Sequence, residues 1–310
     1  MRSWFALGLG LVLLLPASGC SFRKFVTNMM ANAVSSSGPS PLERNKDVEL
    51  ATMAIPTFIV FYEGMLQEVP KHKGLLTQLS QGYTSFTYLG VQQNLDRAKD
   101  TDYRLADKLK ARAKWLYLQG NEYGLRGLEA SHRGFRANLA ARPGEAVKVL
   151  KKKDLQLMYW TAASLGLAIS SGRDDANMVA RIPEVEALID RGLELDETWR
   201  EGAFHEFAIV LAGAKPGRVD YDAVSRHYKR VLELSKGQSA SIHVTYAESV
   251  SVPRQQSAEF REMLERALKE DPEEPADLRL MNELARQRAD WLLGRIDDLI
   301  LNPNAEKESR

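Results

Sequence analysis

Residues 227–237 read HYKRVLELSKG, and the same arrangement of residue types recurs in ALIDRGLELDE (187–197) and MLERALKEDPE (263–273). Each stretch has an apolar residue, two intervening residues, a small or β-branched residue, a leucine and then a charged end. The compact positions are Gly192, Val231 and Ala267, 39 and 36 residues apart. Compact side chains let neighbouring helices approach closely. We therefore predict degenerate helical repeats with insertions, the largest near 173–181.

Helical periodicity extends over nearly the whole chain from Asp47 onward, and no convincing run alternates apolar and polar β-branched residues. The connectors are short and rich in helix breakers, such as Pro143-Gly144 and Lys236-Gly237. Short turns between helices predict antiparallel hairpins, so the expected fold is all-α, with stacked helical hairpins. The predicted helices are 48–69, 73–95, 103–127, 129–141, 153–171, 182–195, 200–213, 220–235, 240–250, 255–270 and 276–301.

The hairpins resemble tetratricopeptide (TPR) repeats, whose period is about 34 residues. Trp115, Leu118, Phe135 and Pro143 fall at repeat positions 4, 7, 24 and 32. Leu76, Leu79, Ser80 and Tyr83 reproduce the first-helix pattern of large, large, small and large residues. We therefore predict a TPR-like domain over residues 47–303. A non-repetitive helical bundle remains the structural alternative.

The last predicted helix, 276–301, begins after Pro275, a favourable residue at the start of a helix. We expect this helix to cap the exposed apolar face that a stack of repeats leaves at its end. A polar tail, 304–310, follows it. The apolar stripe of the helix consists of Leu278, Met281, Leu284, Ala285, Trp291, Leu292, Ile296, Leu299 and Ile300.

The N-terminus has the layout of a bacterial lipoprotein signal peptide, and Cys20 is the only cysteine. Arg2 supplies a positive charge, residues 7–15 form an apolar run, and Ala17-Ser18-Gly19 precede the cysteine. We predict cleavage between Gly19 and Cys20, with lipid on the Cys20 thiol. Residues 1–19 are then the signal peptide, and 20–46 a lipidated N-terminus and flexible linker containing SSSGPSP (35–41). An ordinary signal peptide with a chance cysteine and an uncleaved transmembrane anchor are the alternatives.

The anchor predicts a location in the periplasm, and Ser21, not aspartate, after the cysteine favours the outer membrane. Lys and Arg number 42 against 41 for Asp and Glu, so no strong field exists to attract nucleic acid. Lys151-Lys152-Lys153 is followed by Asp154 and is interpreted as a solvated helix start. The apolar stretch 54–62 is short and contains Pro56, so we expect a buried helix there.

Motifs that carry chemistry are absent from the sequence, so we predict no catalytic residue, no metal site and no cofactor beyond the lipid. HEFAI (205–209) begins like a zinc-protease helix, but Ile209 stands where the second histidine must be. His227 and His243 lie on different predicted helices, and Asp174-Asp175 is interpreted as solvated loop charge. An enzyme would need a site assembled from distant residues such as His205 and Asp222.

Aromatic residues and glycines recur at helical spacing within the predicted helices. We expect most of the aromatic side chains to be core, because aromatic side chains are usually buried. Close helix packing is the simpler reason for the glycines, and room for a ligand or partner is the alternative. The aromatic residues are Phe58, Phe61, Tyr62, Tyr83, Phe86, Tyr88, Trp115, Tyr123, Tyr159 and Trp160, and the glycines are Gly82, Gly90, Gly120, Gly124 and Gly166.

The stretch ATMAIPTFIVFYEGMLQEVPKHKGLLTQLSQGYTSFTYLG (51–90) resembles the N-terminal signature of the TRAP transporter T-component (TatT) lipoproteins. The resemblance spans essentially the whole mature domain. It is carried by Ala54, Pro56, Glu63-Gly64, Pro70, Leu75-Leu76, Tyr83, 115–124, 160–166, His205-Glu206, Tyr246-Ala247-Glu248, Asn282, Ala285, Ala289, Leu292-Leu293 and Asp297-Asp298-Leu299.

This resemblance implies a non-enzymatic periplasmic lipoprotein that binds the substrate-binding P subunit of a tripartite ATP-independent periplasmic transporter. It implies a homo-oligomer, which could be a trimer, and an apolar pore or cleft for an apolar or organic-acid solute, shared with the P subunit. Binding residues are not defined by any short motif. The alternative function is an outer-membrane TPR lipoprotein that acts as a scaffold or pilot for envelope or secretion assembly.

Overall fold

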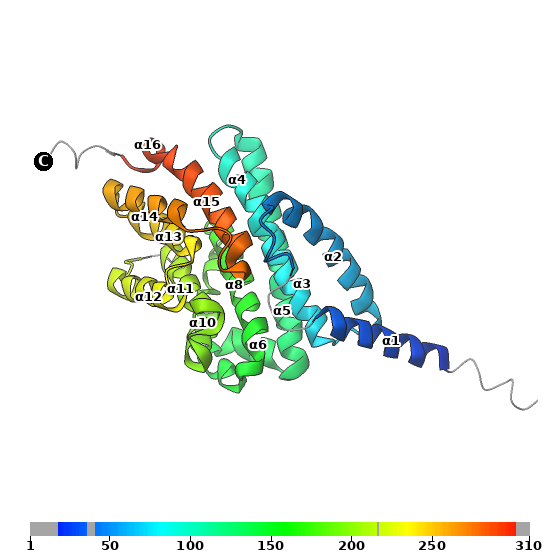
Figure 1. The fold of residues 1–310 in the computed structure, drawn as a ribbon. Helices are drawn as coiled ribbons and strands as arrows, with labels where there is room; N and C mark the ends of the chain where they lie inside the picture. Colours follow the sequence, from blue (N-terminus) through cyan, green and yellow to red (C-terminus); the bar gives the residue numbers. More distant parts are fainter. Residues whose placement is uncertain (1–17, 36–40, 216, 302–310) are drawn as a thin grey trace, which may run out of the picture.

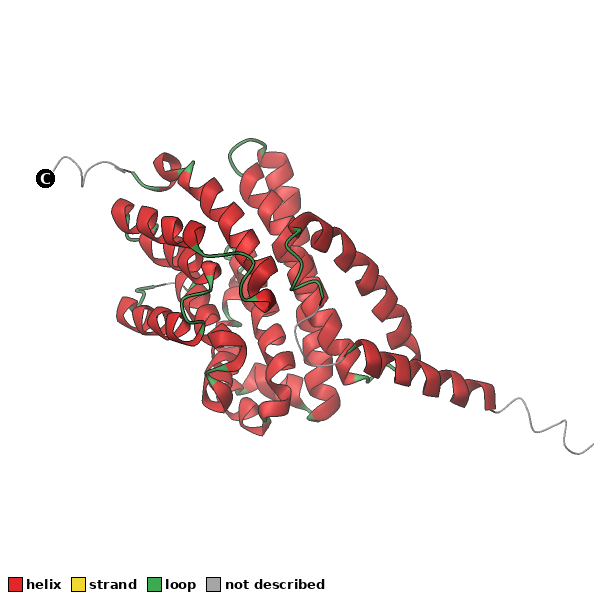
Figure 2. Ribbon diagram, viewed as in Figure 1, coloured by secondary structure: helices red, strands yellow, loops and turns green. Residues whose placement is uncertain are grey.

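The computed structural model describes residues 18–35, 41–215 and 217–301, and these residues form helices and turns without any strand (Figures 1 and 2). The all-α prediction is therefore confirmed. The helices are α1 (Ser18–Val34), α2 (Val48–Glu68), α3 (Lys73–Phe86), α4 (Gln93–Ala98), α5 (Tyr103–Ser131), α6 (Phe135–Ala141), α7 (Pro143–Ala146), α8 (Leu155–Ser171), α9 (Ala176–Val179), α10 (Ile182–Asp196), α11 (Ala203–Ala214), α12 (Tyr221–Leu234), α13 (Ala240–Tyr246), α14 (Ser257–Lys269), α15 (Arg279–Leu293) and α16 (Ile296–Leu299).

Aspartate caps explain why several helices begin where the sequence predicts. The side chains of Asp47, Asp102 and Asp220 accept hydrogen bonds from backbone N–H groups three residues later, at the starts of α2, α5 and α12. Such a cap satisfies a donor that has no partner within the helix and contributes about 1 kcal/mol. Gly134, with φ of 79°, separates α5 from α6, so the predicted helix 129–141 is split.

Consecutive long helices pack against one another as hairpins, as predicted for a stack of repeats. The helices α3, α5, α8 and α10 pack in this order around the largest apolar core, and α11 leads to a second core among α12–α15. In Figure 1 the helices follow one another in colour order across the body. The TPR-like match is only partial, however, because Phe135 is buried whereas Trp115 is 57% exposed.

The three compact repeat positions lie where helices meet, as the sequence predicts. Gly192, Val231 and Ala267 are all buried. A Cβ atom on Gly192 would lie 2.3 Å from Cε1 of Phe204, whose ring is fully buried. The glycine is therefore required for the approach of α10 to α11.

We expect Gly192→Ala to lower the free energy of unfolding by about 1–2 kcal/mol, because overpacking of the Phe204 ring outweighs the better helix propensity of alanine. Gly64→Ala is the matched control, since nothing lies within 4 Å of a Cβ atom at this position in α2. Urea unfolding should show this control to be as stable as the unmodified protein or more stable. A Gly192→Ala variant that is also stabilised would contradict the close packing.

The glycines inside the other helices also serve packing. A Cβ atom at Gly82, Gly90, Gly120, Gly124 or Gly166 would meet a side chain of a neighbouring helix at 3.2 Å or less. Thr52, for example, would be 2.8 Å from a Cβ atom on Gly90. Close packing, the simpler of the two explanations, is therefore confirmed at these positions.

The C-terminal helix does not only cap the last repeat. The predicted helix 276–301 is interrupted at Gly294-Arg295, between α15 and α16. Leu280 and Leu284 of α15 pack into the N-terminal core with α2 and α3. The backbone N–H of Leu280 also donates to the carbonyl of Glu43 at 3.0 Å. The predicted cap is present, because α15 packs against α13 and α14 and contributes Ala285, Ala289 and Leu292 to the C-terminal core. Its contacts with α2 and α3 also join the two ends of the stack.

The segment predicted as a flexible linker contains a helix. Residues 18–34 form α1, which extends from the body beside the end of α2 (Figure 1). Both Gly19 and Cys20, the predicted cleavage site, lie within α1. Residues 1–17 of the predicted signal peptide, 36–40 of the linker and the tail 304–310 lie outside the described residues.

Candidate functional site

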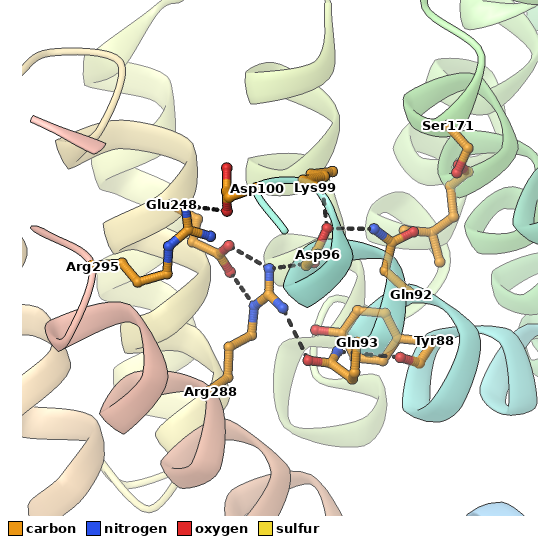
Figure 3. A network of polar contacts seen from close by, with 11 residues as sticks. Tyr88, Gln92, Gln93, Asp96, Lys99, Asp100, Ser171, Glu248, Arg288 and Arg295 are labelled. Carbon is orange, nitrogen blue, oxygen red and sulfur yellow. Dashed lines mark hydrogen bonds and ion pairs between the residues drawn. The ribbon is translucent and has the colours of Figure 1, made fainter. Parts of the chain in front are cut away.

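Two π-helical turns lie beside α15 at the junction of the two ends of the chain. One turn comprises Thr87–Gln92, between α3 and α4, and the other comprises Ala247–Ser251, after α13. A π-helical turn places an extra residue in a helix and is frequent at functional sites. Figure 3 shows Tyr88, from the first turn, and Glu248, from the second, on opposite sides of Arg288.

Arg288 makes hydrogen bonds to three residues on two segments, Glu248 of the second π-helical turn and Gln93 and Asp96 of α4. Its Nε and Nη2 donate to the two carboxylate oxygens of Glu248, at 2.7 and 2.6 Å. The Nη2 group also donates to Oδ2 of Asp96 at 2.9 Å, and Nη1 donates to Oε1 of Gln93 at 2.9 Å. A bidentate contact between arginine and a carboxylate is among the strongest charge-assisted pairs.

The other oxygen of Asp96 is also saturated. Oδ1 accepts hydrogen bonds from Lys99 at 2.7 Å and from Gln92 at 2.9 Å. Burial alone would favour the neutral acid, but Arg288 and Lys99 lower the pKa of Asp96 below its usual value. Burial likewise opposes the charge of Arg288, yet Glu248 and Asp96 raise its pKa well above the usual value. The side chains of the network are therefore charged, and their charges balance one another. Such a network holds α15 against α4 and the second π-helical turn and has no group poised for proton transfer.

The indole of Trp291 extends this network along α15. The guanidinium carbons of Arg288 and Arg295 lie 5.5 and 4.9 Å from the centre of its ring. Arg295 in turn pairs with Asp100 at 2.5 Å, just beyond α4. These contacts fix α15 to the α4 region by charge, in addition to its apolar packing against α2 and α3.

Glu206 is a second interior acid, and it has no cationic partner among its recorded contacts. Its Oε1 accepts a hydrogen bond from Thr245 at 3.1 Å, and Ser241 also bonds it. Burial raises the pKa of Glu206 above its usual value despite these two bonds. Burial also raises the pKa of Tyr88, to about 12. Both side chains keep some accessible surface.

The raised pKa of Glu206 predicts a pH dependence of stability. The folded protein holds this proton more tightly than the unfolded chain, so the contribution of Glu206 is present at acidic pH and is lost as pH rises through the folded pKa. Glu206→Gln should therefore be more stable than the unmodified protein at pH 8 and should gain nothing at pH 4. Thermal unfolding at both pH values measures the difference, and an equal effect at both would contradict it.

His205 and Glu206 point to different partners, so the zinc-protease start has a structural role, as predicted. Nδ1 of His205 lies 2.8 Å from Nδ1 of His227, and its Nε2 lies 3.2 Å from Glu197. Asp222 is exposed and is not among these partners. Among the described residues, no group of three or more histidine, cysteine, aspartate or glutamate side chains is arranged so that it could hold a metal ion.

The remaining charged candidates also have structural partners. Asp174 pairs with Lys110 at 3.2 Å and Asp175 with Lys114 at 2.7 Å, which joins the loop to α5. His243 is buried, receives the hydroxyl of Tyr228 at 2.8 Å, and has its pKa lowered to about 4 by burial. Asp154 is fully buried and pairs with Lys73 and His132, which confirms that the lysine run precedes a helix start.

The outer face of α2 is an exposed apolar surface, defined here as Leu50, Met53, Phe58, Val60 and Phe61. Their exposed fractions range from 44% for Phe58 to 69% for Val60. The expectation of a buried helix at 54–62 was therefore wrong on this side. The inner face, with Ile55 and Ile59, does pack into the core.

These two apolar faces give α2 an unusual composition. Among the described residues, α2 is the helix long and apolar enough to cross a membrane by length and composition alone. Its inner face is part of the folded core, so we attribute this composition to apolar residues on both sides of a core helix. Exposed apolar patches on folded domains commonly mark interaction sites.

A recess of about 560 Å³ adjoins the outer face of α2. It lies between α2, the first π-helical turn and α15, and Met53 belongs both to its lining and to the outer face. Gly90 and Gln93 also line it, and Gln93 holds Arg288. The recess and the outer face therefore form one continuous surface, rigidly backed by the Arg288 network.

Two of the residues that carry the family resemblance, Glu63 and Asn282, hold helices together. Glu63 of α2 accepts hydrogen bonds from Tyr83 and Tyr123, each at 2.7 Å. Asn282 of α15 accepts from the backbone N–H of Ala240 and donates to the carbonyl of Gln238, both at 2.9 Å. The outer face of α2 was not identified as a site from the sequence, although the sequence shows apolar residues on both sides of this helix.

Comparison with known proteins gives two findings. The family model described as TRAP transporter T-component matches residues 44–300. A curated protein of Treponema pallidum (strain Nichols), described as an uncharacterized protein, is 24% identical over 262 residues, which covers 83% of this chain and 81% of its own length.

Proposed function

Because the chain belongs to the TRAP transporter T-component family, we propose that it is a non-enzymatic accessory of solute uptake that binds the substrate-binding P subunit of such a transporter. The family comprises transport accessory proteins and is not a known enzyme family. The family match over 44–300 is the observation that carries the proposal. The charge-saturated site and the exposed apolar surface agree with a protein that binds rather than reacts.

The outer face of α2 and its adjoining recess are the proposed docking surface for the P subunit. Well-packed apolar and aromatic anchors supply most of the binding energy in protein interfaces. Phe58 and Phe61, three residues apart, are such anchors, and Val60, next to Phe61, is 69% exposed.

Copurification tests the main proposal. A tagged form of the protein, isolated from its own cells, should capture a TRAP transporter P subunit as its main partner. Capture of secretion or outer-membrane assembly proteins in its place would support the scaffold function instead. A homo-oligomer, with a trimer as one form, is part of the proposal and is tested by the mass of the isolated complex.

The proposal includes a lipid anchor on Cys20 in the periplasm, with the outer membrane favoured. Cys20→Ala should release a folded protein from the membrane fraction or leave an uncleaved precursor, because the proposed role of this cysteine is to carry the lipid. Cell fractionation and circular dichroism check this outcome. An unfolded domain in the released protein would contradict an independently stable domain behind its anchor.

A further inference from the structure

The helix α1 presents an apolar side that faces away from the domain. Phe22, Phe25 and Met29 are 68%, 64% and 58% exposed. Their spacing of three and four residues places them on one side of a helix. Ala31, which is fully buried, follows Phe22 by nine residues, or two and a half turns, and so lies on the opposite side.

The opposite side fixes α1 to the body of the protein. Ala31 packs into the N-terminal core, and Oδ1 of Asn32 lies 3.0 Å from Nε2 of His72. Arg23 pairs with Glu68, at the end of α2, at 2.7 Å. The helix is therefore held in one orientation relative to α2, and its apolar side is available to something outside the chain.

We propose that α1 lies along the surface of a lipid bilayer, with Phe22, Phe25 and Met29 in the boundary between headgroups and acyl chains. This inference rests on the proposed lipid anchor. The first of these residues follows Cys20 by two positions, so acyl chains on Cys20 bring the apolar side of α1 to the membrane at a high effective concentration. Helices with aromatic residues on one side and basic residues on the other bind in this way.

The charges of α1 also fit a bilayer. No acidic residue occurs within the helix, and Lys24 is exposed on the side away from Phe22, where a helix bound in the membrane interface carries its basic residues. Arg23 pairs with Glu68 and is not counted toward the membrane contact. Because α1 is fixed to α2, this contact would orient the whole domain on the membrane, a property that a lipid on a flexible linker does not provide.

Spin labels on the lipidated full-length protein test the proposal in vesicles of phosphatidylethanolamine and phosphatidylglycerol. Cys20 is the sole natural cysteine, so an introduced cysteine is the only free thiol once Cys20 carries lipid. Labels at Phe22→Cys, Phe25→Cys and Met29→Cys should collide several-fold more with oxygen, relative to a water-soluble nickel chelate, than a label at the control position Lys24→Cys on the opposite side of the helix. Equal access of the chelate to all four positions would overturn the proposal.

Two outcomes separate this proposal from its alternatives. Spin–spin broadening among labels at Phe22, Phe25 and Met29 without oxygen preference would indicate a second copy of the chain on α1 and overturn the bilayer contact. The mass of the N-terminal peptide tests the lipid separately. A lipidated peptide with fully aqueous labels overturns the α1 proposal alone, whereas an unmodified Cys20 overturns the anchor. If Cys20 is unmodified, the protein can be mixed with vesicles directly. Oxygen-accessible labels at Phe22, Phe25 and Met29 would then still support the contact of α1 with the bilayer, and aqueous labels at these positions would overturn it.

Discussion

Arg288→Ala is expected to lower the free energy of unfolding by about 3 kcal/mol, the cost typical of leaving a buried charge without its partner. The side chains of Arg288 and Asp96 are only 11% and 7% exposed. Without the guanidinium group, Asp96 keeps Lys99, but Glu248 loses both of its recorded hydrogen bonds. Urea unfolding followed by far-ultraviolet circular dichroism measures the change.

Two companion variants make the result specific. Lys148→Ala removes a solvent-exposed pair with Glu145 and should leave the free energy of unfolding nearly unchanged. Replacing Arg288→Met, Asp96→Asn and Glu248→Gln together should recover part of the loss, because no carboxylate is left without a partner at the junction and Lys99, which loses Asp96, is 56% exposed to water. A triple variant no more stable than Arg288→Ala would show that packing, and not the unpaired carboxylates, dominates at this junction.

Val60→Ser combined with Phe61→Ser is expected to weaken binding of the P subunit by about 30-fold. Both residues lie on the outer face of α2, and the loss of a central apolar anchor typically costs about 2 kcal/mol, which corresponds to this factor. The fold should be unaffected, since neither side chain is buried. Titration calorimetry with the purified P subunit gives the two dissociation constants.

Trp115→Ser is the matched control for this double variant. Trp115 is 57% exposed on α5 and does not belong to the outer face of α2. Its replacement should leave the affinity within about twofold, as expected for a substitution outside the interface. Equal loss of affinity in the control and the double variant would place the docking surface elsewhere.

Local sequence signals account for most of the helices. The apolar period identifies α2, α8, α10 and α12 within a few residues, and aspartate caps such as Asp47 and Asp220 determine where two of them begin. The small residue at Gly192 predicts a close helix contact because its partner, Phe204, lies in the next long helix. These features depend on residues close together in the sequence, so they can be predicted from the sequence alone.

The closing contacts of α15 could not be predicted in this way. Arg288 and Asp96 are separated by 192 residues, and no period or motif connects them. The helix α1 was missed for a different reason: its apolar side faces away from the core, so the segment was assigned to a linker. The same applies to α2, where apolar residues on both sides predicted burial although one side is exposed.

Titration of the purified, lipid-anchored protein with the TRAP transporter P subunit from the same cells tests the central claim most directly. The account predicts a saturable complex with a dissociation constant in the micromolar range or below, weakened by Val60→Ser with Phe61→Ser and unchanged by Trp115→Ser. The absence of any complex at micromolar concentrations of both proteins would contradict the proposed function.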